Sequence, residues 1–183
     1  TSLPIAGDHN AANALAAVAL CEAVGVSVTK IRDALRDFKG LAHRCVLVRE
    51  HKSVQYFNDS KATNVGSTLA AINGLRNVID GKMVLIAGGD AKGQDLRPLT
   101  APISSSIRAM VLMGKDAEKL AAVTPEHIPI IRAKSLSEAV TLASNVAQKG
   151  DAVVLSPACA SLDMFKDYAD RGDQFCRFVE ALI

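Results

Sequence analysis

The chain contains 183 residues, 49% of them hydrophobic, which is enough apolar material to bury one good core and argues against a disordered protein. A formal net charge of +2 and an aromatic content of 4% exclude the basic stripe and aromatic platforms typical of nucleic-acid-binding proteins, so small molecules are the expected partners. The four cysteines are far apart and form no C-x-x-C pair, so we expect free thiols, without a zinc site or a disulfide framework.

The start of the sequence carries no recognisable targeting signal. Thr1-Ser2-Leu3-Pro4 lacks the basic and apolar regions of a signal peptide, and no apolar run in the chain reaches membrane-spanning length. We therefore expect a cytoplasmic protein that does not contact a membrane. The absence of an initiator Met is compatible with simple processing and equally with a fragment of a longer protein.

Two helices are predicted in the first 40 residues, and they differ in polarity. The segment from Asp8 to Ala23 is rich in Ala, Leu and Val, so its helix is apolar on nearly every side and needs burial all round. The second helix, at about residues 29–38, is amphipathic and offers one apolar face. Because one amphipathic neighbour cannot cover the first helix, we predict that residues 1–40 are the helical tail of a different, central domain.

After Lys39-Gly40 the pattern changes to strands that alternate with helices, so residues 41–183 are predicted to form an α/β domain. The first two strands are close enough for a hairpin, while helix-length segments between the others imply parallel crossovers. A capping box of Ser135 and Glu138 marks one crossover helix. The expected fold is a Rossmann-like, mostly parallel sheet of about six strands with an antiparallel edge hairpin. The predicted strands are residues 45–49, 54–57, 83–87, 109–113, 128–131 and 152–155.

Polar and cationic residues follow these strands at the points where they end. Right-handed crossovers bring such loops to one edge of the sheet, where open α/β sheets bind their ligands. Three lysines, several glycines and serine hydroxyls near helix starts suit a carboxylate or a phosphate, so the sequence predicts an anion site. The segments concerned are residues 58–64, 88–93, 114–116 and 156–161.

Several of these residues also have an ordinary structural interpretation. Lys115 and Asp116 are typical of a solvated helix start, and residues 88–90 suit a tight turn as well as a ligand site. Ser161 suits the cap of a helix that carries Leu162. His43 and Arg44 also suit a boundary pair that is satisfied by backbone. Asp59 and Lys61 also suit a surface ion pair of little energetic weight. These interpretations weaken together, because chance would not place so many such groups on one edge.

Four segments, in the same order, resemble the Mur ligases of peptidoglycan synthesis. Two are similar to motifs shared across that family, the G-x-H-N-x-x-N helix at residues 7–13 and the G-L-x-H-R segment at residues 40–44 that begins its C-terminal domain. The other two, residues 58–64 and 155–163, are similar to signatures of the member that adds D-glutamate, and the D-N-P-R motif of the diaminopimelate-adding member is absent. The resemblance covers the whole chain but only the last part of such an enzyme.

The resemblance implies an ATP-dependent, amide-bond-forming ligase that adds D-glutamate to UDP-N-acetylmuramoyl-L-alanine through an acyl phosphate. Compared with that family, the chain lacks the N-terminal domain, most of the central domain, the phosphate-binding loop and the Mg²⁺ ligands. The chain alone is therefore expected to be inactive. The task implied for its C-terminal domain is to hold the amino acid with its amine free and to bring it against the acyl phosphate.

The resemblance also implies roles for individual residues. The implied D-glutamate ligands are Thr63, Lys92, Ser161, Leu162 and Tyr168, and Tyr168 replaces a family phenylalanine. The residues implied to face ATP are Asn13, Arg44 and Asp59. His43 and Lys61 are the implied catalytic residues, because His43 orients groups at the domain seam and Lys61 lies between the two sites, next to substrate or phosphate. No general base for the incoming amine is identified.

Two other classes of function stay open at the level of sequence. A ligase similar to folylpolyglutamate synthase shares the domain plan but not the Ser-Pro-Ala-Cys-Ala-Ser-Leu-Asp segment at residues 156–163. A stand-alone anion-binding α/β module accounts for the crevice without any chemistry. A G-x-x-x-x-G-K-[ST] loop upstream of Thr1 in the source gene would support a ligase, and its absence would support the module.

Overall fold

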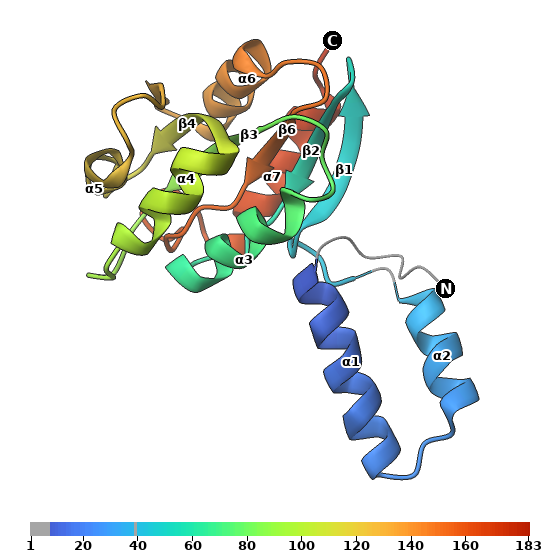
Figure 1. Cartoon of the computed structure of the whole chain (residues 1–183). Helices are drawn as coiled ribbons and strands as arrows, with labels where there is room; N and C mark the ends of the chain where they lie inside the picture. The colour runs from blue at the N-terminus through green and yellow to red at the C-terminus, as the bar shows by residue number, and fades with distance from the viewer. Residues whose placement is uncertain (1–7, 39) are drawn as a thin grey trace.

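The structure, a computed structural model, describes residues 8–38 and 40–183. The predicted features at residues 1–7 and at Lys39, which include Gly7 of the first motif, lie outside the described residues. A helical hairpin of α1 (Asp8–Ala23) and α2 (Val28–Asp37) comes first and projects from an α/β unit formed by the rest of the chain (Figure 1). The two helices agree with the predicted ones, while their assignment to a separate central domain stays a prediction.

One six-stranded sheet organises the α/β unit, in the order β1-β2-β6-β3-β4-β5. The edge pair β1–β2 is antiparallel and every other pair is parallel, which confirms the predicted fold class. Strand β6 is last in the chain but lies between β2 and β3, so it joins the hairpin to the rest of the sheet. The strands are β1 (Val46–His51), β2 (Val54–Asn58), β3 (Met83–Gly88), β4 (Ile107–Met113), β5 (Ile130–Arg132) and β6 (Ala152–Leu155).

Helices cover both faces of the sheet and bury alternate strand residues on each side. Leu85 and Val154 point into the core beneath α3, α4 and α5, while Val84 and Val153 point into the core beneath α6 and α7. None of the helices among the described residues is long and apolar enough to cross a membrane. The helices of this unit are α3 (Val65–Leu75), η1 (Arg97–Leu99), α4 (Thr100–Ser106), α5 (Ala117–Val123), α6 (Leu136–Val146) and α7 (Tyr168–Glu180).

The predicted N-cap of α6 forms, but one of its two hydrogen bonds has a different partner. The Ser135 hydroxyl accepts a hydrogen bond from the Glu138 N–H at 3.2 Å, which confirms the predicted N-cap of α6. The Glu138 carboxylate accepts from the N–H of Lys134, one residue earlier than in a standard capping box. The helix that Ser161 was suited to cap does not form, because the chain after Ser161 makes a series of turns and α7 begins only at Tyr168, capped by Asp167.

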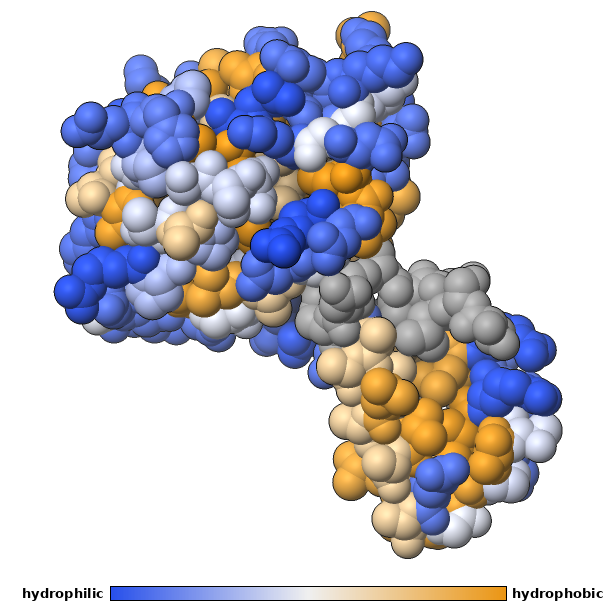
Figure 2. Space-filling view, in the orientation of Figure 1, coloured by the Kyte–Doolittle hydropathy of each residue, from blue (hydrophilic) through white to orange (hydrophobic). Residues whose placement is uncertain are grey.

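The helical hairpin leaves large apolar side chains exposed, as Figure 2 shows by the orange residues gathered on it. On α1, Leu15 is 71% exposed and Leu20 is 70% exposed. Clustered apolar side chains of this kind drive association in water. We expect the isolated chain to self-associate through α1, and the double variant Leu15→Lys, Leu20→Lys to be monomeric in light scattering.

Leu162 provides a matched control for that experiment, because it is also 70% exposed but lies on the α/β unit. Leu162→Lys should leave the association unchanged. A wild-type chain that scatters as a monomer at the same concentration would contradict the prediction.

Candidate functional site

The loops after β2, β3 and β6 meet at one edge of the sheet, as the topology predicted. Strand β6 is hydrogen-bonded to β2 on one side and to β3 on the other, in parallel register, so the carboxyl ends of all three strands are adjacent. The three loops carry Lys61, Lys92 and Ser161, respectively. We call this place the carboxyl edge.

The β2 end is fixed to α7 through Asn58, which is 2% exposed. Its amide nitrogen lies 3.0 Å from the carbonyl of Gly172 and 3.1 Å from Nδ1 of His43. The imidazole of His43 is thus within hydrogen-bonding distance of a side chain, whereas the structural interpretation expected a backbone partner. Its Nε2 lies 3.7 Å from the Asp173 carboxylate. A Cβ at Gly172 would collide with the imidazole, so this glycine leaves the room that His43 occupies.

Lys61 stands over an aromatic ring at the same end of β2. Its ammonium lies 3.6 Å from the centroid of the Tyr168 ring, a cation–π contact. The His43 ring meets Tyr168 edge-on with the centroids 6.1 Å apart. The structure thus brings the two predicted catalytic residues and the predicted substrate residue Tyr168 together. Lys61 makes no ion pair with Asp59, so the surface-pair interpretation is wrong for these two residues.

The loop of residues 89–93 that follows β3, here called the glycine loop, packs directly on the loop after β6. Asp90 and Ala160 exchange two backbone hydrogen bonds of 3.0 and 2.9 Å. Gly89 has a φ of +123°, and a Cβ there would collide with the carbonyl of Ala160, so only glycine allows this approach. The Lys92 N–H donates to the Asp90 carboxylate at 2.8 Å, while its side chain is exposed at the carboxyl edge.

Lys115 and Asp116 are part of the same constellation, and the solvated-helix-start interpretation is wrong for Asp116. Asp116 is 6% exposed and accepts the N–H of Ala91 at 2.8 Å, so it holds the glycine loop in place. Its ion pair with Lys119 and that backbone hydrogen bond keep the pKa of Asp116 below its usual range. The Lys115 ammonium is exposed but lies 3.0 Å from the Asp90 carboxylate.

The remaining predicted D-glutamate ligands lie at or beside this edge with different exposure. Ser161 is 3% exposed, and its hydroxyl makes no hydrogen bond with any other residue that the structure describes. A buried hydroxyl without a partner has hydrogen-bonding capacity left for a ligand. Leu162 is exposed, and Thr63 is half-buried just after Lys61.

Asp59 is buried beneath the edge and is already bonded on both carboxylate oxygens. One oxygen accepts the N–H of Cys45 at 3.1 Å and the other accepts the hydroxyl of Ser156 at 2.8 Å. Burial raises the pKa of Asp59 to about 7, although both hydrogen bonds and the nearby Arg44 charge act in the opposite direction. Asp59 is 7% exposed, so little of its carboxylate is accessible to a ribose hydroxyl.

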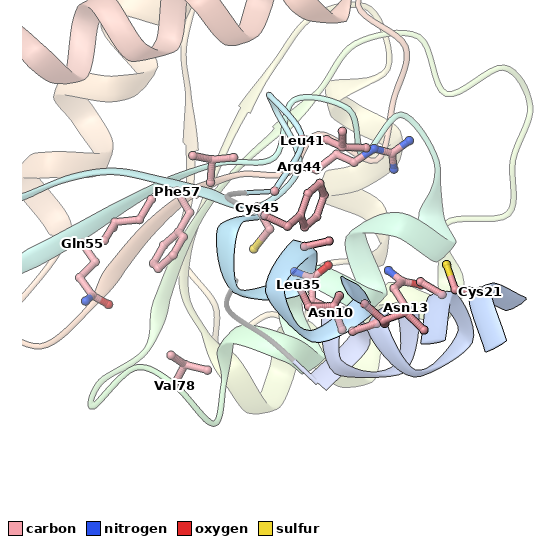
Figure 3. Close-up of a pocket in the computed structure, with 18 residues that line it drawn as sticks. Asn10, Asn13, Cys21, Leu35, Leu41, Arg44, Cys45, Gln55, Phe57 and Val78 are labelled. Carbon is pink, nitrogen blue, oxygen red and sulfur yellow. The ribbon is translucent and has the colours of Figure 1, made fainter. Parts of the chain in front are cut away.

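A cavity of about 810 Å³ lies between the helical hairpin and the hairpin of β1 and β2. Its walls are mainly apolar and include Ala14, Leu35 and Phe57, and α1 contributes Asn13 (Figure 3). Arg44, which follows α2, lines the same cavity, so the structure brings these two of the three predicted ATP-facing residues together. Asp59 does not line it. The size, apolar walls and few polar groups are those of a small-molecule site.

One residue at the carboxyl edge was missed from the sequence. Arg171 is fully buried and donates hydrogen bonds to backbone carbonyls of the β2, β3 and β6 loops. It lies between Asp170 and Asp173 in a polar stretch that resembles a solvated helix start, so no sequence signal distinguishes it from a surface residue. Within residues 8–38 and 40–183, no cluster of three His, Cys, Asp or Glu side chains is placed to hold a metal ion.

The domain that this arrangement represents is a known one. The family described as "Mur ligase, glutamate ligase domain" matches residues 43–159, more than half of the chain. The chain belongs to this family.

Named relatives are similar over nearly the whole chain. The "UDP-N-acetylmuramoylalanine--D-glutamate ligase" of Pseudomonas savastanoi pv. phaseolicola is 54% identical over 98% of this chain, and the protein of the same name from Legionella pneumophila is 51% identical over 99%. The chain spans 40% of the length of each of these relatives.

Solved structures with little sequence identity share the fold. The UDP-N-acetylmuramate-alanine ligase MurC of Thermotoga maritima matches with a TM-score of 0.71 at 14% identity, over 98% of this chain and 39% of that chain. The folylpolyglutamate synthase of Mycobacterium tuberculosis, in complexes with ADP and AMPPCP, matches with a TM-score of 0.73 at 18% identity, over 94% of this chain and 41% of that chain. At such identities the likeness concerns the fold alone.

Proposed function

We propose that this chain is the C-terminal part of a cytoplasmic, ATP-dependent ligase that adds D-glutamate to UDP-N-acetylmuramoyl-L-alanine in peptidoglycan synthesis. The observation that carries the proposal is the 54% identity, over 98% of the chain, to a protein named as the D-glutamate ligase. The domains that would complete the enzyme, together with the ligands of the Mg²⁺ that it is expected to use, are proposed to lie in the remaining 60% of such a protein.

The carboxyl edge is the proposed D-glutamate site. Two exposed or half-buried ammonium groups, Lys61 and Lys92, approach it from different loops, and the free Ser161 hydroxyl lies on a third. A dianionic amino acid needs separated cationic and hydrogen-bonding groups for its two carboxylates, and this arrangement supplies them. Thr63 and the Leu162 backbone are proposed to contact the same substrate.

His43 and Lys61 have proposed roles at the boundary between the two sites. The Tyr168 ring keeps the Lys61 ammonium in place by the cation–π contact, so this charge is held where an incoming carboxylate or phosphate would approach. His43, held by Asn58, orients the same ring from its edge. Both residues are proposed to position reactants, and neither needs to transfer a proton.

The cavity behind the carboxyl edge is the proposed nucleotide site. ATP, when bound, supplies the phosphoryl group that activates the carboxylate of the nucleotide-sugar substrate. The apolar walls suit the base of a nucleotide, and the Asn13 amide can hydrogen-bond to polar atoms at the edge of that base. Arg44 provides a cation for the phosphates. We propose that Asp59 contributes to this site through Cys45, which lines the cavity and whose N–H it binds, or by exchanging one partner for a ribose hydroxyl.

The full-length ligase that contains this chain provides the direct test. ADP release should require ATP, Mg²⁺, UDP-N-acetylmuramoyl-L-alanine and D-glutamate together, and L-glutamate should not replace D-glutamate. The chain of residues 1–183 alone should release no ADP, because its sequence contains no G-x-x-x-x-G-K-[ST] loop.

Two results would refute the proposal. Turnover with a folate acceptor and L-glutamate would favour the folylpolyglutamate synthase-like alternative. A full-length protein that binds small anions but releases no ADP with any acceptor would favour the stand-alone module.

A further inference from the structure

Arg171 is a fully buried arginine at the start of α7, and its side chain extends under the carboxyl edge. Its Nε donates to the Ser60 hydroxyl at 3.0 Å, and one terminal nitrogen donates to the Ser60 carbonyl at 2.9 Å. Both terminal nitrogens lie 3.3 Å from the carbonyl of Cys159, and one lies 3.5 Å from the carbonyl of Gly88. One planar group therefore contacts three different loops.

Each contacted carbonyl lies close in sequence to a proposed substrate ligand. Ser60 directly precedes Lys61, Cys159 lies two residues before Ser161, and Gly88 ends the strand that leads to Lys92. The Ser60 hydroxyl also donates to the carbonyl of Tyr168 at 2.7 Å, which ties the aromatic partner of Lys61 to the same centre.

The guanidinium makes no ion pair in the described part of the chain, and the Asp163 charge acts on it only from a longer distance. All its hydrogen-bond acceptors are carbonyls or a hydroxyl, and no carboxylate lies within ion-pairing distance. Desolvation lowers the pKa of Arg171 to about 10, so it stays charged at neutral pH. A buried charge without a counter-ion is costly. The hydrogen bonds to the surrounding carbonyls offset part of this cost, and they fix the segments that carry these carbonyls relative to one another.

We propose that Arg171 is the positioning residue of the carboxyl edge, which sets the relative placement of Lys61, Lys92 and Ser161 by holding the backbones of their three loops. The identity of the substrate in this proposal rests on the proposed function, whereas the contacts between Arg171 and the loop backbones are independent of it. Lysine cannot replace it, because an ammonium has neither the fork nor the five N–H donors that reach three loops at once.

The test compares Arg171→Lys with Arg108→Lys in the full-length ligase. Arg108 pairs with the buried Asp151 at the opposite end of the strands, so it is a matched arginine without contact to the edge. Arg171→Lys should raise the KM for D-glutamate about tenfold and change the KM for ATP less than about twofold. Arg108→Lys should lower the melting temperature and leave both KM values unchanged.

A second measurement does not depend on activity. In the 183-residue chain, amide hydrogen exchange at residues 60–63, 88–93 and 159–162 should be about tenfold faster in Arg171→Lys, with the strand interiors unchanged. If Arg171→Lys does not fold, Ser60→Ala removes one acceptor of the same centre and should give a smaller effect in the same direction.

The outcomes separate the two proposals. Unchanged exchange at the three loops, or equal increases of both KM values in the Arg171 variant, would overturn the positioning role. A wild-type enzyme that does not turn over D-glutamate would refute the proposed substrate. The hydrogen-exchange data would still decide the role of Arg171.

Discussion

Asp59→Asn should stabilise the chain at pH 8 by about 2–3 kcal/mol. The pKa of Asp59 is raised from 3.8 to about 7 in the folded chain, so ionising this buried carboxyl costs about 4 kcal/mol of folding free energy. Asparagine carries no charge, and its carbonyl oxygen can still accept from the Cys45 N–H while its amide donates to Ser156. The loss of one charge-assisted hydrogen bond reduces the net gain.

The sign of the pH dependence follows from a folded-state pKa that lies above the unfolded one. The contribution of Asp59 to stability is fully present below about pH 4, decreases as the pH rises, and is lost above about pH 7. The difference in unfolding free energy between variant and wild type should therefore grow across this window and then level off.

Urea denaturation of both proteins between pH 4 and pH 8.5 measures that difference. Asp95→Asn is the control, because Asp95 is exposed and its pKa is lowered by hydrogen bonds with Arg97, so its curve should not diverge in the same direction. A constant offset between Asp59→Asn and wild type at every pH would show that the carboxyl is not neutral in the folded chain.

Lys92→Ala in the full-length ligase should raise the KM for D-glutamate about ten- to a hundredfold. A charge-assisted hydrogen bond in a partly dry crevice is worth roughly 1.5–3 kcal/mol of binding. The substitution keeps the N–H that donates to Asp90, so the loop and the folding free energy should hardly change. The KM for ATP should rise much less, because Lys92 does not line the cavity.

Lys149→Ala is the matched control for this experiment. Lys149 is an exposed lysine on the turn that leads into β6, at the other end of the strands, whereas Lys115 pairs with Asp90 and is not a neutral choice. Steady-state kinetics with each substrate varied separately are sufficient. Equal, small changes in the KM for D-glutamate in both variants would contradict the assignment of Lys92. An increase of the KM for ATP alone would contradict it as well.

Strand positions and the location of the crevice were predictable from sequence because both depend on local patterns. Apolar runs of strand length, helix-length spacers and right-handed crossovers determine which loops share an edge, and all six predicted strands form within a few residues of their expected bounds. The loops of Lys61, Lys92 and Ser161 were predicted to share an anion site because they follow those strands directly, while the roles of these three residues came from the resemblance to the ligase family.

The roles of buried polar groups were not predictable, since they depend on contacts between distant segments. Asp59 looks like a surface acid beside Lys61 in the sequence, yet its partners are Cys45 and Ser156, the latter 97 residues away. Arg171 is 111 residues from Ser60, its principal partner. Asp116 has the sequence context of a solvated helix start, but it becomes buried because the glycine loop folds over it.

The position of β6 in the sheet has a consequence for synthesis of the protein. The ribosome makes the β1–β2 hairpin and the β3–β4–β5 group well before residues 152–155, and the described structure has no direct strand pairing between these two groups. The two groups of strands therefore cannot join into one sheet until β6 emerges from the exit tunnel. Arg171 follows 16 residues after β6 ends, so the centre that joins the three loops is the last part of the edge to be translated, and a chain released early would have strands but no site.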